Sequence, residues 1–186
     1  MDAHGPVVPP RDRHAREDDA EQIAELQVAA WRTAYAGILP AAELHGLDTV
    51  ALTGFWRGQI ASAAAAGAHV LVHDDGQRIT GFSAFGPARD DDLRQRPGVE
   101  ELYAFYARPE CWGTGVGRSL MRSTLSIWAD RGTPAGYLWV LERNARGRAF
   151  YQKGGWRHDP TAAPSGSDPG ALEIRYELTE PGTRGR

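Results

Sequence analysis

The 186-residue sequence contains one cysteine, one lysine and no apolar run of membrane-spanning length. Because Cys111 has no second cysteine to pair with, an internal disulfide is excluded and a reducing compartment, the cytoplasm, is expected. A membrane helix needs ~20 consecutive apolar residues, and the N-terminal segment also lacks the apolar core of a secretory signal. We therefore predict no membrane partner.

The charged residues exclude a second class of partner. The formal net charge is −3, whereas a dedicated nucleic-acid-binding protein has a basic excess. Nearly all basic residues are arginine, with Lys153 the sole lysine, and alanine and glycine are abundant, which hints at a GC-rich bacterial genome. With 41% hydrophobic residues, the chain has the composition of a globular protein.

The length predicts one domain, residues 13–178, between a flexible leader, residues 1–12, and a flexible tail, residues 179–186. Apolar residues at helical spacing predict a first helix that begins after Asp19 and ends near Gly37. A second helical region is expected from Pro40 to about residue 66.

Apolar and aromatic stretches between turn residues predict strands in the rest of the chain. The expected strands span residues 68–73, 78–86, 99–107, 136–142 and 171–179, with a further strand start in residues 154–159. A broad apolar helical face follows Val116 until Gly132, and a short helix is expected over residues 145–153. Strands and helices are interspersed, which indicates a mixed α/β fold.

The segment ARPECWGTGVGRSLM places Gly113, Gly115 and Gly117 directly before that long helix. Glycines admit backbone shapes that side chains forbid, and an anion held by bare N–H groups at a helix start accounts for three of them. A P-loop would need a lysine that is absent, and a dinucleotide fingerprint would need GxGxxG near the first strand. A tight turn without a ligand remains the structural alternative.

The order of the motifs resembles the GNAT superfamily of N-acetyltransferases. In that family a strand ending in V-x-P leads into a Q/R-x-x-G-x-G/A turn whose amides hold the pyrophosphate of coenzyme A. Here Ala107 stands in the valine place, Pro109 aligns, and Trp112 stands where the family has Gln or Arg. Asn144, AFYQKGGW and the N-terminal AAWRTAYAGILP are also similar to family features, so the resemblance covers about residues 13–178.

This resemblance implies a central, mostly antiparallel, splayed sheet of about six to seven strands flanked by about four helices. It also implies acetyl-CoA as co-substrate, with the pantetheine arm paired to main-chain groups of the strand before the turn. The residues assigned to the co-substrate are Phe105, Ala107, Trp112, Gly113, Thr114, Gly115, Val116, Gly117, Arg118 and Asn144. No metal is expected, because the histidines have no ligand spacing.

The implied reaction is direct attack of a primary amine on the thioester. An alkyl amine with a pKa of ~10.4 is protonated at neutral pH, so a base must remove a proton. Glu101 is the preferred carboxylate, and Glu142 is a third candidate. Glu100 lies on the opposite face of the strand, so we expect one of these two neighbours to face the cleft and the other to be solvated. Tyr151 matches the family tyrosine that donates toward the departing sulfur. The structural alternatives are surface glutamates and a core tyrosine.

The acceptor is expected to be a small-molecule or peptide amine. Trp31 and Tyr35 lie in the region that lines the acceptor side in the family, although both positions also suit a helical core. The acidic run Asp90–Asp92 either attracts a cationic acceptor or forms a solvated loop. The alternative function is a non-catalytic acyl-CoA sensor of the same fold. A homodimer through the closing strand is left open.

Overall fold

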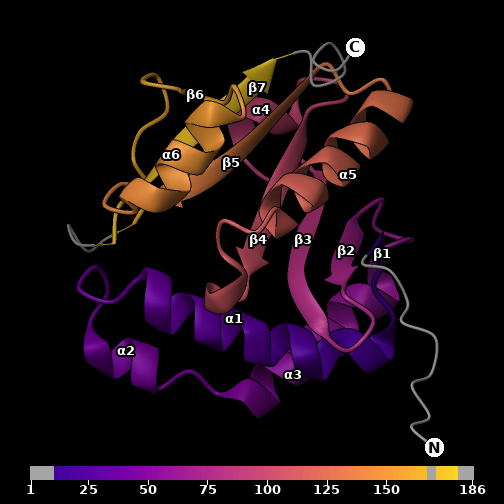
Figure 1. The fold of residues 1–186 in the computed structure, drawn as a ribbon. Helices are drawn as coiled ribbons and strands as arrows, with labels where there is room; N and C mark the ends of the chain where they lie inside the picture. Colours follow the sequence, from indigo (N-terminus) through magenta and orange to yellow (C-terminus); the bar gives the residue numbers. More distant parts are fainter. Residues whose placement is uncertain (1–10, 167–170, 180–186) are drawn as a thin grey trace, which may run out of the picture.

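The computed structural model describes residues 11–166 and 171–179. Within them, a seven-stranded sheet has the order β1-β2-β3-β4-β5-β7-β6, and only β4 and β5 run parallel (Figure 1). The strands are β1 (Arg11–His14), β2 (His69–Asp74), β3 (Ile79–Pro87), β4 (Glu100–Ala107), β5 (Ala135–Leu141), β6 (Arg157–His158) and β7 (Glu173–Thr179). The mixed α/β fold with a mostly antiparallel sheet is confirmed.

Four long helices and two short ones surround this sheet within the described residues. They are α1 (Ala20–Ala34), α2 (Ala41–His45), α3 (Thr49–Ser62), α4 (Asp91–Arg94), α5 (Val116–Asp130) and α6 (Ala145–Lys153). The helical region expected from Pro40 is divided, because Asp48 begins a new helix there by accepting hydrogen bonds from the amides of Val50 and Ala51. No helix of the described ranges is long and apolar enough to cross a membrane.

Strand β1 corrects the expected start of the domain. It begins at Arg11, so Arg11 and Asp12 belong to the sheet rather than to the leader. The carboxylate of Asp12 contacts the His73 ring on β2 and accepts hydrogen bonds from Ser119 and Ser123 on α5. The rest of the leader and the tail from residue 180 lie outside the described residues.

The helices divide into two layers, one on each face of the sheet. Helices α5 and α6 pack with the side chains of Phe105 and Ala107 in one apolar cluster. Helices α1 and α3 pack with Ala104 and Tyr106 in another. Figure 1 shows α1, α2 and α3 gathered on the side away from α5. Alternate residues of β4 therefore face different layers, as strand geometry requires.

The sheet opens between β4 and β5. These strands pair only where Glu100–Leu102 faces Gly136–Leu138. At the end of this pairing Tyr103 is an extra residue in β4, because Leu102 faces Phe85 and Ala104 faces the adjacent Ala84 on β3. Beyond this bulge, β4 pairs with none of the described strands on its β5 side, so the expected splay is confirmed.

The closed end of the strand pair is packed tightly against α5. Gly136 on β5 lies beneath the fully buried ring of Trp128, and a Cβ atom at this glycine would overlap the ring. The glycine therefore sets how closely the C-terminal part of α5 approaches the sheet.

Candidate active site

The glycine turn leaves a row of backbone amides without acceptors. The amides of Trp112 and Thr114 donate within the turn, to the carbonyls of Pro109 and Cys111. Five others have no acceptor among the described residues; they are the amides of Gly113, Gly115, Val116, Gly117 and Arg118. An unpaired N–H is unfavourable unless water or a ligand accepts from it.

The backbone of this turn requires glycine at two positions. Gly113 has φ +83° and Gly115, the N-cap of α5, has φ +109°. No side chain caps the helix, and its first turn contains no acidic residue. Because the N-terminus of a helix has about half a positive charge, the turn is suited to an anion. Arg118 is exposed beside it.

Gly117 has a packing role as well. A Cβ atom at this position would lie 3.3 Å from the Phe150 ring, which stacks on Phe105 with a centroid distance of 5.4 Å. The glycine therefore lets α6 approach α5 next to the turn. Burial raises the pKa of the nearby Cys111 thiol, so this cysteine is not an activated nucleophile.

Trp112 occupies part of the strand edge that was assigned to the pantetheine arm. Because the Arg108 amide donates to Thr80 on β3, alternation directs the main-chain groups of Ala107 and Phe105 to the open side. The Trp112 indole donates to the Ala107 carbonyl at 3.0 Å. That carbonyl is therefore already paired, and the Ala107 amide and the main-chain groups of Phe105 remain on the open side.

Asn144 caps α6, as the sequence predicts. Its side-chain oxygen accepts a hydrogen bond of 2.9 Å from the Gly147 amide. The same helix positions Tyr151, whose ring contacts Phe105 and Trp156.

The Tyr151 hydroxyl has no hydrogen-bond partner within the described part of the chain. Burial raises the pKa of Tyr151, and the neighbouring Tyr106 adds to this effect. The phenol is therefore protonated at neutral pH and available as a donor.

On the other face of the sheet, Trp31 of α1 and Tyr35, the C-cap of α1, meet Tyr106 of β4. The hydroxyls of Tyr35 and Tyr106 are 3.4 Å apart, and the Trp31 ring packs edge-on against Tyr35. The buried indole nitrogen of Trp31 has no acceptor among the described residues. Tyr106 was missed from the sequence because an aromatic residue in a buried strand resembles core.

Glu101 is placed differently from the expected free base. Its side chain is 3% exposed and accepts hydrogen bonds from the Arg89 guanidinium at 2.6 and 3.0 Å and from the Tyr137 hydroxyl at 2.7 Å. The Tyr137 hydroxyl in turn accepts from the amides of Arg89 and Asp90. Glu101 therefore holds the loop after β3 against the sheet.

Glu100 faces the other way, as alternation predicts, and pairs with Arg131 at 3.1 Å. The expectation that one of these two glutamates would be solvated is wrong, because both are buried. Burial raises the pKa of Glu100, although Arg131 opposes this shift. Glu142 is exposed just after β5.

Glu173, at the start of β7, was not identified from the sequence. It is half-buried, and its carboxylate has no hydrogen bond or ion pair among the described residues. Burial raises the pKa of Glu173, and the charge of Glu101 adds to it. Glu173 faces Leu141 on β5, beyond the stretch of β5 that pairs with β4, so it lies at the end of β5 where the sheet opens.

The acidic run after β3 is largely neutralised. The buried Arg175 of β7 pairs with Asp90 at 3.2 Å, Asp92 at 2.8 Å and Asp159 at 2.7 Å. Asp91 is exposed and contacts Arg94 of the same helix. The run is therefore more than a solvated loop, since two of its carboxylates attach the loop to β7.

Comparison with known proteins identifies the family. The model of the acetyltransferase (GNAT) family matches residues 20–156. The chain belongs to the GNAT family. The splayed strands and the uncapped glycine turn are thus features of a GNAT acetyltransferase, and the enzyme class is acyltransferase.

Relatives and solved structures agree with this assignment. An uncharacterized N-acetyltransferase of Bacillus subtilis, YuaI, is 31% identical over 140 residues, which cover 75% of this chain and 76% of the relative. A probable N-acetyltransferase of Mycobacterium tuberculosis is 25% identical and covers 77% of both chains. The PaiA N-acetyltransferase of Thermoplasma acidophilum in complex with coenzyme A has the same fold, with a TM-score of 0.74, 18% identity and coverage of 92% of this chain and 100% of that one.

Proposed function

We propose that this GNAT protein transfers an acetyl group from acetyl-CoA to a primary amine by direct attack in a ternary complex. The observation that carries the proposal is the row of five unpaired amides at the start of α5, beside the open edge of β4. In this proposal the amides of Gly113 and of residues 115–118 hold the pyrophosphate, and Arg118 adds a charge. A solved neighbour from Thermoplasma acidophilum with coenzyme A, and one from Salmonella typhimurium with acetyl-CoA, support this choice of co-substrate.

The arm of the co-substrate extends along β4 toward Tyr106. The Ala107 amide and the main-chain groups of Phe105 pair with it as a neighbouring strand would. Trp112 and Asn144 border this path, and Thr114 stabilises the turn through its bond to the Cys111 carbonyl. The thioester then lies at the opening between β4 and β5, where Tyr151 approaches from one layer and Tyr35 and Tyr106 from the other.

In the reaction, the amine nitrogen forms a bond to the thioester carbonyl carbon, and the bond from that carbon to sulfur breaks. The amine gives up a proton, and the leaving thiolate takes one up. Full proton transfer from a phenol of pKa ~10 to a thiolate of ~8.5 is uphill by about 2 kcal/mol, and burial of Tyr151 increases this cost. Tyr151 therefore stabilises the sulfur through a hydrogen bond and gives up its proton only as the bond breaks.

We assign the proton-accepting role to Glu173, acting directly or through water. Glu101, favoured from the sequence, is occupied by its bonds to Arg89 and Tyr137 and is not free to accept a proton from the amine. Glu173 has no such partner, and burial raises the pKa of its carboxyl group toward neutral pH. Glu101 then acts as a positioning residue for the loop after β3.

The test measures thiol release from acetyl-CoA with a panel of primary amines. We expect amine-dependent turnover, and kcat about 100-fold lower or more in Tyr151→Phe and Glu173→Gln, with acetyl-CoA affinity within twofold of the parent. Since the base must be deprotonated, kcat of the parent rises with pH through the pKa of Glu173, and this rise is lost in Glu173→Gln. Binding of acetyl-CoA without turnover of any amine would favour the acyl-CoA sensor instead.

A further inference from the structure

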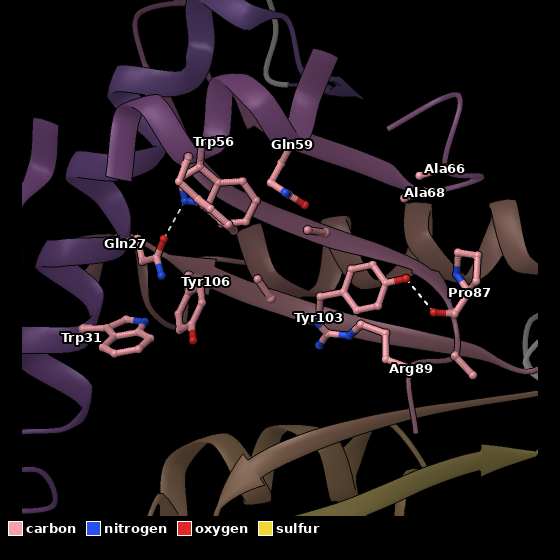
Figure 2. Close-up of a pocket in the computed structure, with 14 residues that line it drawn as sticks. Gln27, Trp31, Trp56, Gln59, Ala66, Ala68, Pro87, Arg89, Tyr103 and Tyr106 are labelled. Atoms are coloured by element: carbon pink, nitrogen blue, oxygen red, sulfur yellow. Dashed lines mark hydrogen bonds between the residues drawn. The ribbon is translucent and has the colours of Figure 1, made fainter. Parts of the chain in front are cut away.

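A cavity of about 460 Å³ lies on the α1 and α3 face of the sheet, next to the proposed reaction centre (Figure 2). Its walls come from α1, α3, the segment before β2, and strands β3 and β4. Figure 2 shows Trp31 and Tyr106 at one end and Ala66, Ala68 and Pro87 at the other. Trp31 and Tyr106 also belong to the site around Tyr35, so the cavity continues from that site.

Five of the fourteen residues that line the cavity are aromatic, and Gln27 and Gln59 add two polar amides. Trp31, Phe55, Trp56, Tyr103 and Tyr106 line the cavity, and Ala84 and Ala104 form part of its floor. Tyr103 and Tyr106 are three residues apart on β4, so they are separated by ~10 Å along the strand. The cavity is thus long enough for a ring and a short alkyl chain in line.

Charge is nearly absent from this lining. Arg89 is the one charged residue among the residues that line the cavity, and Glu101 behind it neutralises it. Its guanidinium lies 4.2 Å from the centre of the Tyr103 ring, so one face of this ring already contacts a cation. No carboxylate among the lining residues is available to a second ammonium group.

Given the transferase function proposed above, we propose that the acceptor is an arylalkyl amine, whose aromatic group lies in this cavity while its amine reaches Tyr106 and Tyr35. Edge-to-face contact with Trp31 and Tyr106 stabilises such a ring, and burial of its apolar surface adds to the affinity. A polyamine or a lysine-rich peptide would place its second cation beside Arg89 without a counter-charge. The cavity therefore selects against polycations.

The first measurement is a calorimetric titration of the full chain saturated with coenzyme A. The probes are phenethylamine, n-butylamine and spermidine. We expect phenethylamine to bind at least tenfold more tightly than either of the other two. Tightest binding of spermidine, a difference of less than threefold between phenethylamine and n-butylamine, or no binding of phenethylamine would each overturn the proposal.

Two alanine variants locate the binding. Ala104→Leu extends a side chain into the middle of the cavity, whereas Ala51→Leu adds the same group at an exposed position of α3 outside it. We expect Ala104→Leu to weaken the binding of phenethylamine at least fivefold and to leave the binding of n-butylamine within twofold. Ala51→Leu should change neither affinity. Equal weakening of both amines, or no change, would contradict a ring in this cavity.

The two proposals fail in different ways. Coenzyme A is titrated first, and absence of coenzyme A binding would overturn the acetyltransferase function while the amine titration of the protein alone still tests the cavity. Coenzyme A binding together with preferred binding of spermidine would leave the acetyltransferase function intact and overturn only the arylalkyl amine.

Discussion

Helices α3 and α5 begin in opposite ways. At α3, the Asp48 carboxylate accepts from the amides of Val50 and Ala51, at 2.8 and 3.2 Å. At α5, Gly115 stands at the N-cap with φ +109°, and no side chain accepts from the amides that follow. Both helices are about equally long, so the difference does not come from length.

The two N-termini make different contributions: a capped one stabilises the fold, and an uncapped one leaves its amides free to bind a ligand. A capped N-terminus satisfies its own amides and stabilises the helix by ~1 kcal/mol. An uncapped one gives up that contribution and leaves its amides and the helix dipole to a ligand. The chain thus caps α3 and, in our proposal, reserves α5 for the pyrophosphate.

The largest expected effect is that of Gly115→Asp. A carboxylate at this N-cap would accept from the same amides as the pyrophosphate and repel it, and the residue would also be strained at this φ. We expect at least a 100-fold loss of acetyl-CoA affinity by calorimetry. Unchanged affinity would show that the turn binds no phosphate.

A smaller effect is expected at Asn144, the cap of α6. Asn144→Asp keeps an acceptor for the Gly147 amide, so stability should change by less than ~0.5 kcal/mol. If the side chain also borders the co-substrate, the new negative charge repels it and weakens acetyl-CoA binding about fivefold, roughly 1 kcal/mol. Asn144→Ala is the counterpart. Because it removes the cap, we expect the free energy of unfolding to fall by ~1 kcal/mol and the acetyl-CoA affinity to change little.

Arg118→Ala should raise the Kd for acetyl-CoA about threefold to fivefold. The contact is exposed and screened by salt, which limits its contribution to ~1 kcal/mol or less. Arg122→Ala, also exposed and one turn further along α5, serves as the control and should leave the Kd unchanged. Equal effects of both variants would indicate long-range attraction rather than a contact.

Asp48→Ala should leave binding unaffected and lower stability. We expect the free energy of unfolding to fall by ~1 kcal/mol in urea titrations, with the acetyl-CoA Kd within twofold of the parent. A parallel loss of affinity would mean that the two helix starts are coupled, and the distinction between them would fail.

Elements with strong local signals were predictable from the sequence. The apolar face after Val116 and the turn residue Gly132 define α5, and the aromatic alternation of residues 99–107 defines β4. Strand β1 was missed because its four polar residues have no apolar alternation and are held by pairing with the distant β2. Its assignment depends on long-range contacts that a local pattern does not contain.

The candidate site divides in the same way. The glycine turn was predictable because backbone conformation is local, and Tyr151 and Asn144 came from the resemblance. The surroundings of Glu101 and Glu173, on which their proposed roles rest, were not predictable, because they depend on which carboxylate Arg89 reaches from its loop. Glu173 was hidden in a strand with charged residues at alternate positions, Glu173, Arg175 and Glu177, and only the tertiary structure distinguishes it from Glu177.

Gly136 does not touch the glycine turn, but it contacts the helix that begins there. Trp128 rests on this glycine, and ~18 Å of helix separate Trp128 from Val116 at the start of α5. A methyl group at position 136 would push Trp128 and the C-terminal part of α5 away from the sheet. The N-terminal end of the same helix bears the unpaired amides. In our proposal, the missing side chain at Gly136 therefore also fixes where α5 presents its N-terminal amides to the pyrophosphate.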